Sequence, residues 1–368
     1  MLIEHPYLFS FGFLVVAGLF FSLPAFKFLD TADSHQKNHN HAMDSLRYFL
    51  ASFVFMSHSV RMMGFVKDGT WKGTVHEFNY LAVLGVSLFF AITAVLFWGK
   101  IKDQPLDFIK LYKNRIFRIV PLIWFNSIAI LIVTCLLSKS APNLNFLYWL
   151  DPLNNSRPDF NAFNGSWALT GGVFWTLVYE WGFYFCLPLL FIFRRYKLET
   201  SITLVFLMLY ISSYLDLKIN FGVIMPFMIG MLAIDIAERV KINRFALNIA
   251  LITSIFSLLY FMPRLQNVSS IANLFMLIIM ICVIKNADMF GFLKVKGFQR
   301  LGAASYSIYV MHAMMLYIIF KLANKYDILA NYPITTMVAS YSIILIVSAL
   351  TYRFVETVFI NIGRKVNF

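Results

Sequence analysis

The sequence predicts an all-α protein that lies in a membrane as a bundle of about 11 helices. Of its 368 residues, 60% are hydrophobic and only 13% are charged, and the mean hydropathy is +0.72. Soluble domains contain about 25% charged residues, and one aqueous core could not bury so much apolar surface. The apolar residues also form separate runs, long enough to cross the ~30 Å hydrocarbon layer of a bilayer.

These apolar runs number eleven when they are followed along the chain. The first has no Lys or Arg before it and is long for a secretory signal, so we expect it to be retained as a membrane span. The short pair in the middle of the chain is the least marked. The runs cover residues 6–29, 44–64, 80–98, 117–137, 172–193, 201–217, 221–237, 245–262, 269–285, 301–320 and 334–354.

The distribution of basic residues predicts the orientation of the bundle, because Lys and Arg gather in the cytoplasmic loops of membrane proteins. With eleven spans, one side carries the first loop, every second loop after it and the C-terminus. That side holds 22 of the 31 Lys and Arg residues, and the other side holds 9. The N-terminus is therefore predicted to lie outside and the C-terminus in the cytoplasm.

Charge and cysteine content exclude other classes of protein. The 31 Lys and Arg exceed the 18 Asp and Glu, but in a membrane protein this excess indicates loops beside anionic lipid rather than a nucleic-acid surface. The three cysteines all lie in apolar runs, so we expect buried thiols and no disulfide framework. They are Cys135, Cys186 and Cys282.

Two of the seven histidines, His58 and His312, fall inside predicted spans. An ionisable side chain in a span is costly and therefore suggests a function. At 1.5 Å per residue, these two and Glu180 lie at a similar depth, ~9–12 Å from the outer boundary. Equal depth predicts one shared polar cavity. The plainer interpretation of each residue alone is a packed side chain that a neighbouring helix satisfies.

Arg47 and His58 lie eleven residues apart in the second predicted span. Eleven residues turn a helix ~20° beyond three full turns and rise ~16 Å. Both side chains are therefore expected on one helix face, with Arg47 at the cytoplasmic mouth and His58 in the outer half. Arg61 is expected at the outer boundary.

A basic segment at residues 100–121 holds six Lys and Arg residues on the cytoplasmic side. Arg115 and Arg118 lie one helical turn apart at the entrance to the next span, and Lys113 precedes them. Arginine forms bidentate contacts with phosphate. We therefore expect either a site for a phosphate-rich cofactor or contacts with lipid headgroups.

Two predicted loops carry further polar clusters. His35, His39 and His41 could bind a metal, but their spacing matches no standard site, so a solvated loop is favoured and no metal is expected. The outer segment 138–171 is rich in Asn and aromatic residues. It predicts either a surface that recognises an acceptor or an ordered cap over the bundle.

Several segments, in order, match a known pattern. DSLRYFLASFVFMSH contains an Arg-x10-His spacing, LGVSLFFAITAVLF contains Gly-Val-x-x-Phe-Phe, and RIFRIVP contains Arg-x-x-Arg-Ile-x-Pro. WTLVYEWGFYFCLP carries Glu180 among aromatic residues, LGAASYSIYVMH ends at His312, and YRFVETVF contains Glu356. From residue 44 to about residue 364 the chain resembles the membrane-bound acyltransferase-3 family, whose members O-acylate glycans and related cell-surface molecules.

The sequence departs from this family pattern in a few places. Thr93 and Ala94 stand where the family often has Ser-Gly, and Val358 replaces a proline, so we expect altered local packing. Residues 44–368 are assigned to an acyltransferase-3-like transmembrane domain, and residues 1–43 to an extra N-terminal helix with its histidine-containing loop. No extracellular catalytic domain follows, so we expect the membrane domain to acylate the acceptor itself or to supply a separate protein.

The resemblance implies an O-acetyltransferase, integral to a bacterial cytoplasmic membrane, that takes an acetyl group from cytoplasmic acetyl-CoA. The acceptor implied is a hydroxyl of a glycan or glycolipid on the outer side. His58 would deprotonate this hydroxyl or briefly carry the acetyl group, and Glu180 would orient His58 or the acceptor. The implied catalytic residues are His58, Glu180 and Arg47; the donor-binding residues are Arg47, Lys113, Arg115 and Arg118; the acceptor-binding residues are Arg61, Trp175, Tyr179, Ser305, Tyr309 and His312.

Two functions of other kinds remain open. A glycolipid transporter or flippase would line a path with the same polar residues, and it would be expected to have broken helices near the midplane. Gly and Pro here lie mostly near the ends of the spans, which disfavours that function. A membrane glycan polymerase would likewise use arginines in the membrane and a large outer loop.

Overall fold

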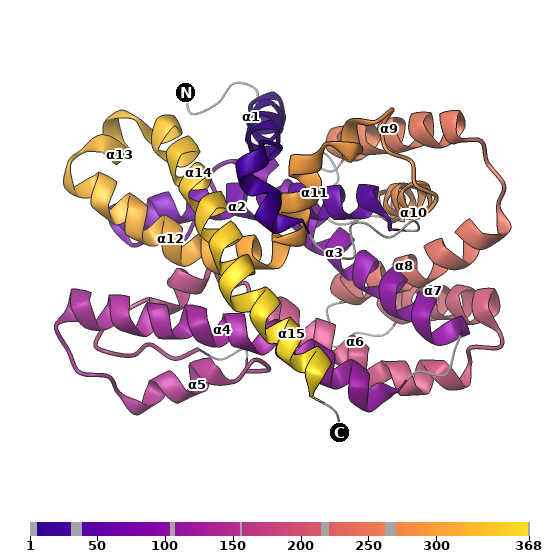
Figure 1. Ribbon diagram of the computed structural model, residues 1–368, viewed down its shortest axis with the longest axis horizontal. Coiled ribbons are helices and arrows are strands. Elements are labelled where there is room, and N and C mark those ends of the chain that lie inside the picture. Colours follow the sequence, from indigo (N-terminus) through magenta and orange to yellow (C-terminus); the bar gives the residue numbers. More distant parts are fainter. Residues whose placement is uncertain are drawn as a thin grey trace.

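The computed structural model describes residues 6–30, 39–103, 107–154, 157–214, 221–261 and 270–366. Within these ranges the secondary structure is helical apart from one isolated β-bridge between Phe160 and Phe163. The predicted all-α class is therefore confirmed for the described residues. Figure 1 shows the helices and the two ends of the chain.

The first half of the chain forms α1 (Pro6–Phe21), η1 (Pro24–Leu29), α2 (His41–Asp68), α3 (His76–Asp103), α4 (Phe108–Ser138), η3 (Leu144–Phe146), α5 (Leu147–Leu150), η4 (Ser166–Thr170) and α6 (Trp175–Ile192). The second half forms α7 (Lys197–Tyr214), α8 (Phe221–Arg239), α9 (Arg244–Phe261), α10 (Ser270–Ile284), η5 (Phe292–Lys294), α11 (Lys296–Ala303), α12 (Ser305–Lys325), α13 (Ile328–Asn331), α14 (Pro333–Thr351), η6 (Tyr352–Glu356) and α15 (Thr357–Lys365).

Seven helical segments of the described chain are long and apolar enough to cross a membrane: α2, α3, α4, α6, α9, α12 and the continuous segment from α14 to α15. Helices α1 and α10 are apolar but shorter. A helix occurs at each of the eleven predicted runs. The chain is thus an integral membrane protein, while the number of eleven spans and their orientation stay predictions.

Helix α2 lies at the centre of the bundle and packs against α3, α11 and α12. Its start is fixed because the Asn40 side chain accepts a hydrogen bond of 3.0 Å from the Met43 N–H, which satisfies an otherwise free donor of the first turn. It ends at Gly69, whose φ of 76° is a left-handed conformation that favours glycine. Helix α3 in turn packs on α6 and α8.

Two predicted spans differ from the observed helices. The run 6–29 stops as an α-helix at Phe21, because Pro24 lacks the N–H that a continuing helix needs and begins the 3₁₀ helix η1 instead. The run 301–320 is divided between α11 and α12. Helix α11 lies so close to α2 that a Cβ atom on Gly302 would come within 1.9 Å of the Asp44 carbonyl oxygen.

The C-terminal helices run in one line across the molecule, from α14 through η6 to α15, and α15 packs on α4 (Figure 1). The intervening η6 is a π-helix, whose wider turn is frequent at functional sites. It places Tyr352 and Glu356 in the interior.

The loop after α10 is held by Asp288, which is buried. Its carboxylate pairs with Arg244 and Lys294, the latter at 2.8 Å, and accepts a hydrogen bond from the Gly291 N–H. Burial alone would raise the pKa of Asp288, but the hydrogen bonds from Lys294, Gly291 and Arg244 outweigh it, so the pKa lies below its ordinary value of 3.8. Asp288 therefore stays ionised at neutral pH.

Candidate active site

Two adjacent cavities in the described part of the bundle contain most of the predicted site residues, and three side chains border both of them. The smaller, about 130 Å³, is lined by the arginines of α2 and α4, and we call it the arginine cavity. The larger, about 610 Å³, contains His58, and we call it the histidine cavity. Because Val86, Phe90 and Tyr309 line both, the cavities are adjacent and share this apolar and aromatic layer.

The arginine cavity brings together Arg47, Arg115 and Arg118, which were predicted as donor-binding residues. Arg47 pairs with Asp44 one turn earlier on α2, at 3.3 Å. The Arg115 guanidinium lies over the Phe97 ring, 5.0 Å from its centroid. Three guanidinium groups in one small cavity provide a site for a multiply charged anion such as a phosphate ester.

Arg118 is positioned by a buried carboxylate. Its Nε lies 3.7 Å from Glu356 Oε1, and Ser307 Oγ donates a hydrogen bond of 3.1 Å to Glu356 Oε2. Glu356 comes from the π-helix η6 and is 1% exposed. Through these two contacts Glu356 of the C-terminal segment links α4 to α12.

Glu180 also belongs to the arginine cavity, where the Tyr184 hydroxyl donates a hydrogen bond to it from one turn later on α6. Ser305 lines the same cavity. The sequence predicted that Glu180 would share a cavity with His58 and His312 and would orient His58 or the acceptor. The structure places it on the other side of the Tyr309 layer, because α6 packs on α3 and α8 while α12 packs on α2.

His58 and His312 form a hydrogen-bonded pair of imidazoles. Nδ1 of His58 lies 2.8 Å from Nε2 of His312, and Nδ1 of His312 lies 3.2 Å from the Ile308 carbonyl oxygen. A carbonyl only accepts hydrogen bonds, so the proton of a neutral His312 is on Nδ1 and its Nε2 accepts from His58. It follows that Nδ1 of His58 carries a proton and that Nε2 of His58 has a free lone pair, as a general base requires.

The remaining wall of the histidine cavity is polar and aromatic. Asn79 accepts hydrogen bonds from Ser57 Oγ at 2.9 Å and from Arg61 Nη2 at 3.0 Å. The Trp71 ring lies 5.8 Å from the His58 ring, and Trp175 is a further lining residue. Aromatic faces beside fixed polar groups are suited to a ligand that has both an apolar face and hydroxyl groups.

Tyr309 is a wall residue with an occupied hydroxyl. Its O–H donates to the Val173 carbonyl oxygen at 3.2 Å and lies 3.0 Å from Thr176 Oγ1. These bonds join α12 to the start of α6. The Tyr309 ring therefore stays fixed between the two cavities. Tyr179, which was predicted to bind the acceptor, packs on Trp175 with the ring centroids 5.7 Å apart.

The segment 138–171, predicted to lie on the outer side, contacts His58 through Gly171. Gly171 has a φ of 64°, and a Cβ atom on it would lie 2.8 Å from Nδ1 of His58 and 3.0 Å from Cβ of Ala313. Glycine is thus required by both conformation and space. The backbone that follows η4 covers the histidine pair at this point.

The described part of this outer segment is internally bonded, as an ordered cap would be. Asp159 accepts hydrogen bonds of 2.8 Å from the Gly165 and Ser166 N–H groups. Arg157 donates to the Trp149 carbonyl oxygen at 2.9 Å and lies over the Phe174 ring at 4.1 Å. Burial lowers the pKa of Arg157 to about 10, with Asp151 acting in the opposite direction, so this guanidinium remains charged at neutral pH.

Lys113 was predicted at the donor site but does not line it, and three lining residues were not predicted. Lys113 donates a hydrogen bond to the Val366 carbonyl oxygen and is not among the residues that line the arginine cavity. Trp71 and Asn79 were missed because they lie in no motif. Tyr184 had a signal in the sequence, since it follows Glu180 by four residues and so shares its helix face.

The sequence is similar to one protein family and to proteins of known activity. The profile of the family described as "Acyltransferase domain" matches residues 40–353. The O-acetyltransferase OatA of Staphylococcus aureus, in strains NCTC 8325 / PS 47 and COL, is 22% identical over 318 residues, which cover 74% of this chain and 52% of the relative. The chain thus spans about half the length of these relatives. No solved structure matches the chain significantly.

Proposed function

The chain belongs to the Acyltransferase domain family, and from this premise we propose that it is a membrane O-acetyltransferase acting on a glycan. The donor is acyl-CoA, most simply acetyl-CoA, bound at the arginine cavity. The acceptor is a glycan or glycolipid hydroxyl bound at the histidine cavity. The observation that carries the proposal is the His58–His312 pair, which leaves Nε2 of His58 free, together with the adjacency of the histidine cavity and the arginine cavity.

The donor side follows from charge and size. Arg115 and Arg118 bind phosphate groups of the donor, and Arg47 and Ser305 belong to the same lining. A cavity of about 130 Å³ is smaller than the ~300–1,000 Å³ of typical ligand pockets. It therefore takes one end of the donor, and the thioester approaches the layer of Val86, Phe90 and Tyr309.

The acceptor side is the larger cavity. A sugar ring stacks on Trp71 or Trp175, and Asn79 and Arg61 bind its hydroxyl groups. Aromatic stacking leaves the ring edges free for hydrogen bonds. We assign Trp71 and Asn79 to acceptor binding in addition to the predicted Arg61 and Trp175.

His58 acts as the general base. Nε2 of His58 takes the proton of the acceptor hydroxyl while the hydroxyl oxygen attacks the thioester carbonyl carbon. The C–S bond breaks, and His58 returns the proton to the departing sulfur. The products are an acetyl ester and free coenzyme A, and His58 ends neutral. The hydrogen bond to His312 stabilises the imidazolium that forms in between.

The orientation predicted from the basic residues supports this division. It places the ends of α2 and α4 that carry the arginines in the cytoplasm, where acyl-CoA is available, and places His58 toward the outer side. A bacterial cytoplasmic membrane provides both compartments. The membrane lipid surrounds the bundle, and the OatA relatives are O-acetyltransferases by name.

The test uses the full chain in proteoliposomes with labelled acetyl-CoA and a panel of glycans. We expect label in one class of glycan with the wild type and with His76→Ala, which removes an imidazole from outside both cavities. We expect none with His58→Ala at equal protein level. Movement of glycan across the membrane without acetylation would instead establish a transporter, and growth of glycan chains would establish a polymerase.

A further inference from the structure

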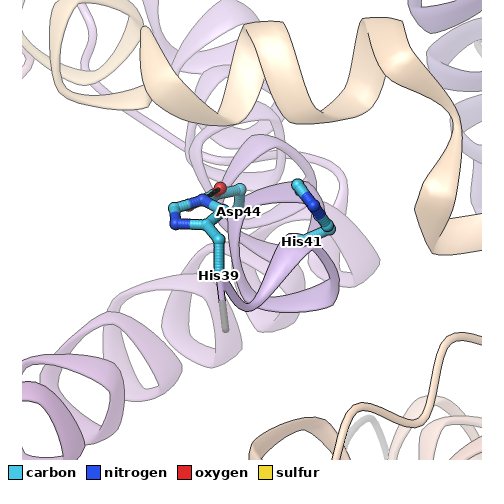
Figure 2. A group of neighbouring side chains, drawn as sticks. All are labelled: His39, His41 and Asp44. Atoms are coloured by element: carbon cyan, nitrogen blue, oxygen red, sulfur yellow. Dashed lines mark hydrogen bonds and ion pairs between the residues drawn. The ribbon is translucent and has the colours of Figure 1, made fainter. Parts of the chain in front are cut away.

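A cluster of metal-ligating side chains lies at the start of α2, and none of its members lines either cavity. His39, His41 and Asp44 offer one ligand atom each, and these atoms all lie within 4.8 Å of one another. Figure 2 shows the three side chains around the first turn of the helix, with the His39 ring against the Asp44 carboxylate and His41 beside them. His35, grouped with them in the sequence, lies outside the described residues.

The arrangement follows from the helix start. His41 and Asp44 are three residues apart in the first turn of α2, so they lie on neighbouring positions of one face. His39 precedes the helix, and its Nε2 contacts Asp44 Oδ2. The other carboxylate oxygen, Oδ1, is the one that binds Arg47. A ligand at Oδ2 therefore leaves the Asp44–Arg47 pair in place.

An independent observation indicates a ligand at this cluster. Nδ1 of His41 is buried and has no hydrogen-bond partner among the described residues. A buried polar atom without a partner is costly, and native structures satisfy nearly all such atoms. A metal ion held with His39 and Asp44 would satisfy it.

The cluster is held by its surroundings and still reaches solvent. Asn40, between the two histidines, donates to the Val283 carbonyl oxygen at 2.8 Å, and Ser45 Oγ donates to the Leu293 carbonyl oxygen at 2.6 Å. The His39 and Asp44 side chains are 23% and 15% exposed. Ions can therefore enter a site whose backbone is already fixed, so little ordering is required on binding.

We propose that His39, His41 and Asp44 bind a divalent transition metal, with Zn²⁺ the ion that fits best. Two imidazoles favour Zn²⁺ and related metals over Mg²⁺ and Ca²⁺, which prefer oxygen ligands. In a tetrahedral zinc site with bonds of ~2.1 Å the ligand atoms lie ~3.4 Å apart, so small side-chain rotations complete the geometry. Three protein ligands leave one position for water.

Nearby charges set a limit on the affinity. Lys294 and Lys296 act electrostatically on His41 and oppose a cation. Lys294 is paired with Asp288 at 2.8 Å, which neutralises most of its effect. Coordination by neutral imidazoles depends less on net charge than binding of a hard cation does. The site is therefore selective for transition metals.

The test measures binding of Zn²⁺ itself, by isothermal titration, to the full chain purified in detergent with an affinity tag free of histidine. We expect one tight site per chain in the wild type and in His76→Gln, a histidine change outside the cluster. In His41→Gln and in His39→Gln the affinity falls more than about 100-fold, because loss of a ligand exceeds the 10- to 100-fold effect of losing a supporting partner.

A thermal-shift measurement gives a second readout that does not depend on activity. Zn²⁺ raises the melting temperature of the wild type and not that of the His41→Gln variant, because a ligand that binds only the folded state stabilises it. If His41→Gln does not fold, Asp44→Asn takes its place. Equal Zn²⁺ affinity of the wild type and the ligand variants, or no binding by the wild type, overturns the proposal.

Discussion

Replacement of His312 by phenylalanine tests how the protein sets the protonation of His58. His312 is fully buried, and Phe fills the same space with no nitrogen atom. The variant removes the acceptor that lies 2.8 Å from Nδ1 of His58. The tautomer of His58 with the proton on Nδ1 is then no longer stabilised by this hydrogen bond. His58 shifts toward the tautomer with the proton on Nε2, in which Nε2 has no free lone pair.

The magnitude follows from the lost hydrogen bond. A buried donor left without its partner costs about 1–3 kcal/mol, which corresponds to about a 5- to 160-fold loss of kcat. The KM for acetyl-CoA is expected to stay unchanged, because His312 is absent from the lining of the arginine cavity. The assay is acetyl transfer in proteoliposomes at saturating donor, with melting temperature as the control for folding.

His312→Gln is the matched variant, because the Gln side-chain oxygen can accept the hydrogen bond from His58 as Nε2 of His312 does. We expect it to recover most of the activity that His312→Phe loses. Wild-type kcat in His312→Phe would refute the reasoning. A stable His312→Gln variant as inactive as His312→Phe, or a change in acceptor KM alone, would show that His312 binds substrate instead.

Three further predictions concern the cap, the donor and pH. Gly171→Ala and Gly172→Ala both strain a backbone with a positive φ, but only Gly171→Ala adds an atom against His58. We expect kcat to fall up to about 100-fold in Gly171→Ala and to stay near the wild-type value in Gly172→Ala. Equal kcat in the two variants would contradict this. Arg118→Lys loses bidentate phosphate binding, so its KM for acetyl-CoA rises about tenfold (~1.4 kcal/mol). Lys113 is not in the cavity lining, so Lys113→Ala keeps the wild-type KM. A raised KM in Lys113→Ala with a wild-type KM in Arg118→Lys would refute the placement of the donor. The pKa of Asp288 is lowered, so its carboxylate stabilises the fold at pH values above its ordinary pKa of 3.8 and loses this effect as the pH falls through the folded-state pKa. The difference in melting temperature between the wild type and Asp288→Asn therefore shrinks on acidification. A difference that does not change with pH would contradict this.

The fold class and the α2 pair were predictable because they depend on local sequence. Composition indicates whether a chain can fold as a soluble protein. Helix periodicity places Arg47 and His58 on one face of α2 without any knowledge of the other helices. The Arg115–Arg118 spacing is local in the same way. These features needed no knowledge of which helices are neighbours.

The partner of His58 was not predictable, because depth along a helix does not determine helix order. Glu180 and His312 lie at similar predicted depths, but only α12 packs on α2. Such features depend on tertiary packing, which cannot be deduced from the pattern of a single sequence.

Buried carboxylates near the ends of spans were also difficult to recognise. Asp235 in α8 is 1% exposed and accepts hydrogen bonds from Trp98 Nε1 at 2.9 Å and Ser201 Oγ at 2.5 Å. It joins α3, α7 and α8. In the sequence it lies two residues from the end of a predicted span, where an acid at the membrane boundary is unremarkable.

The central claim is that His58 acts as the general base for transfer of an acetyl group from a donor on the arginine side to an acceptor on the other side. It is tested most directly with proteoliposomes in which labelled acetyl-CoA and the acceptor glycan are separated by the membrane. We predict that the wild type labels the glycan when acetyl-CoA is on the arginine side and not in the reverse arrangement, and that His58→Ala does not label it. Label transfer by His58→Ala at the wild-type rate would contradict the account.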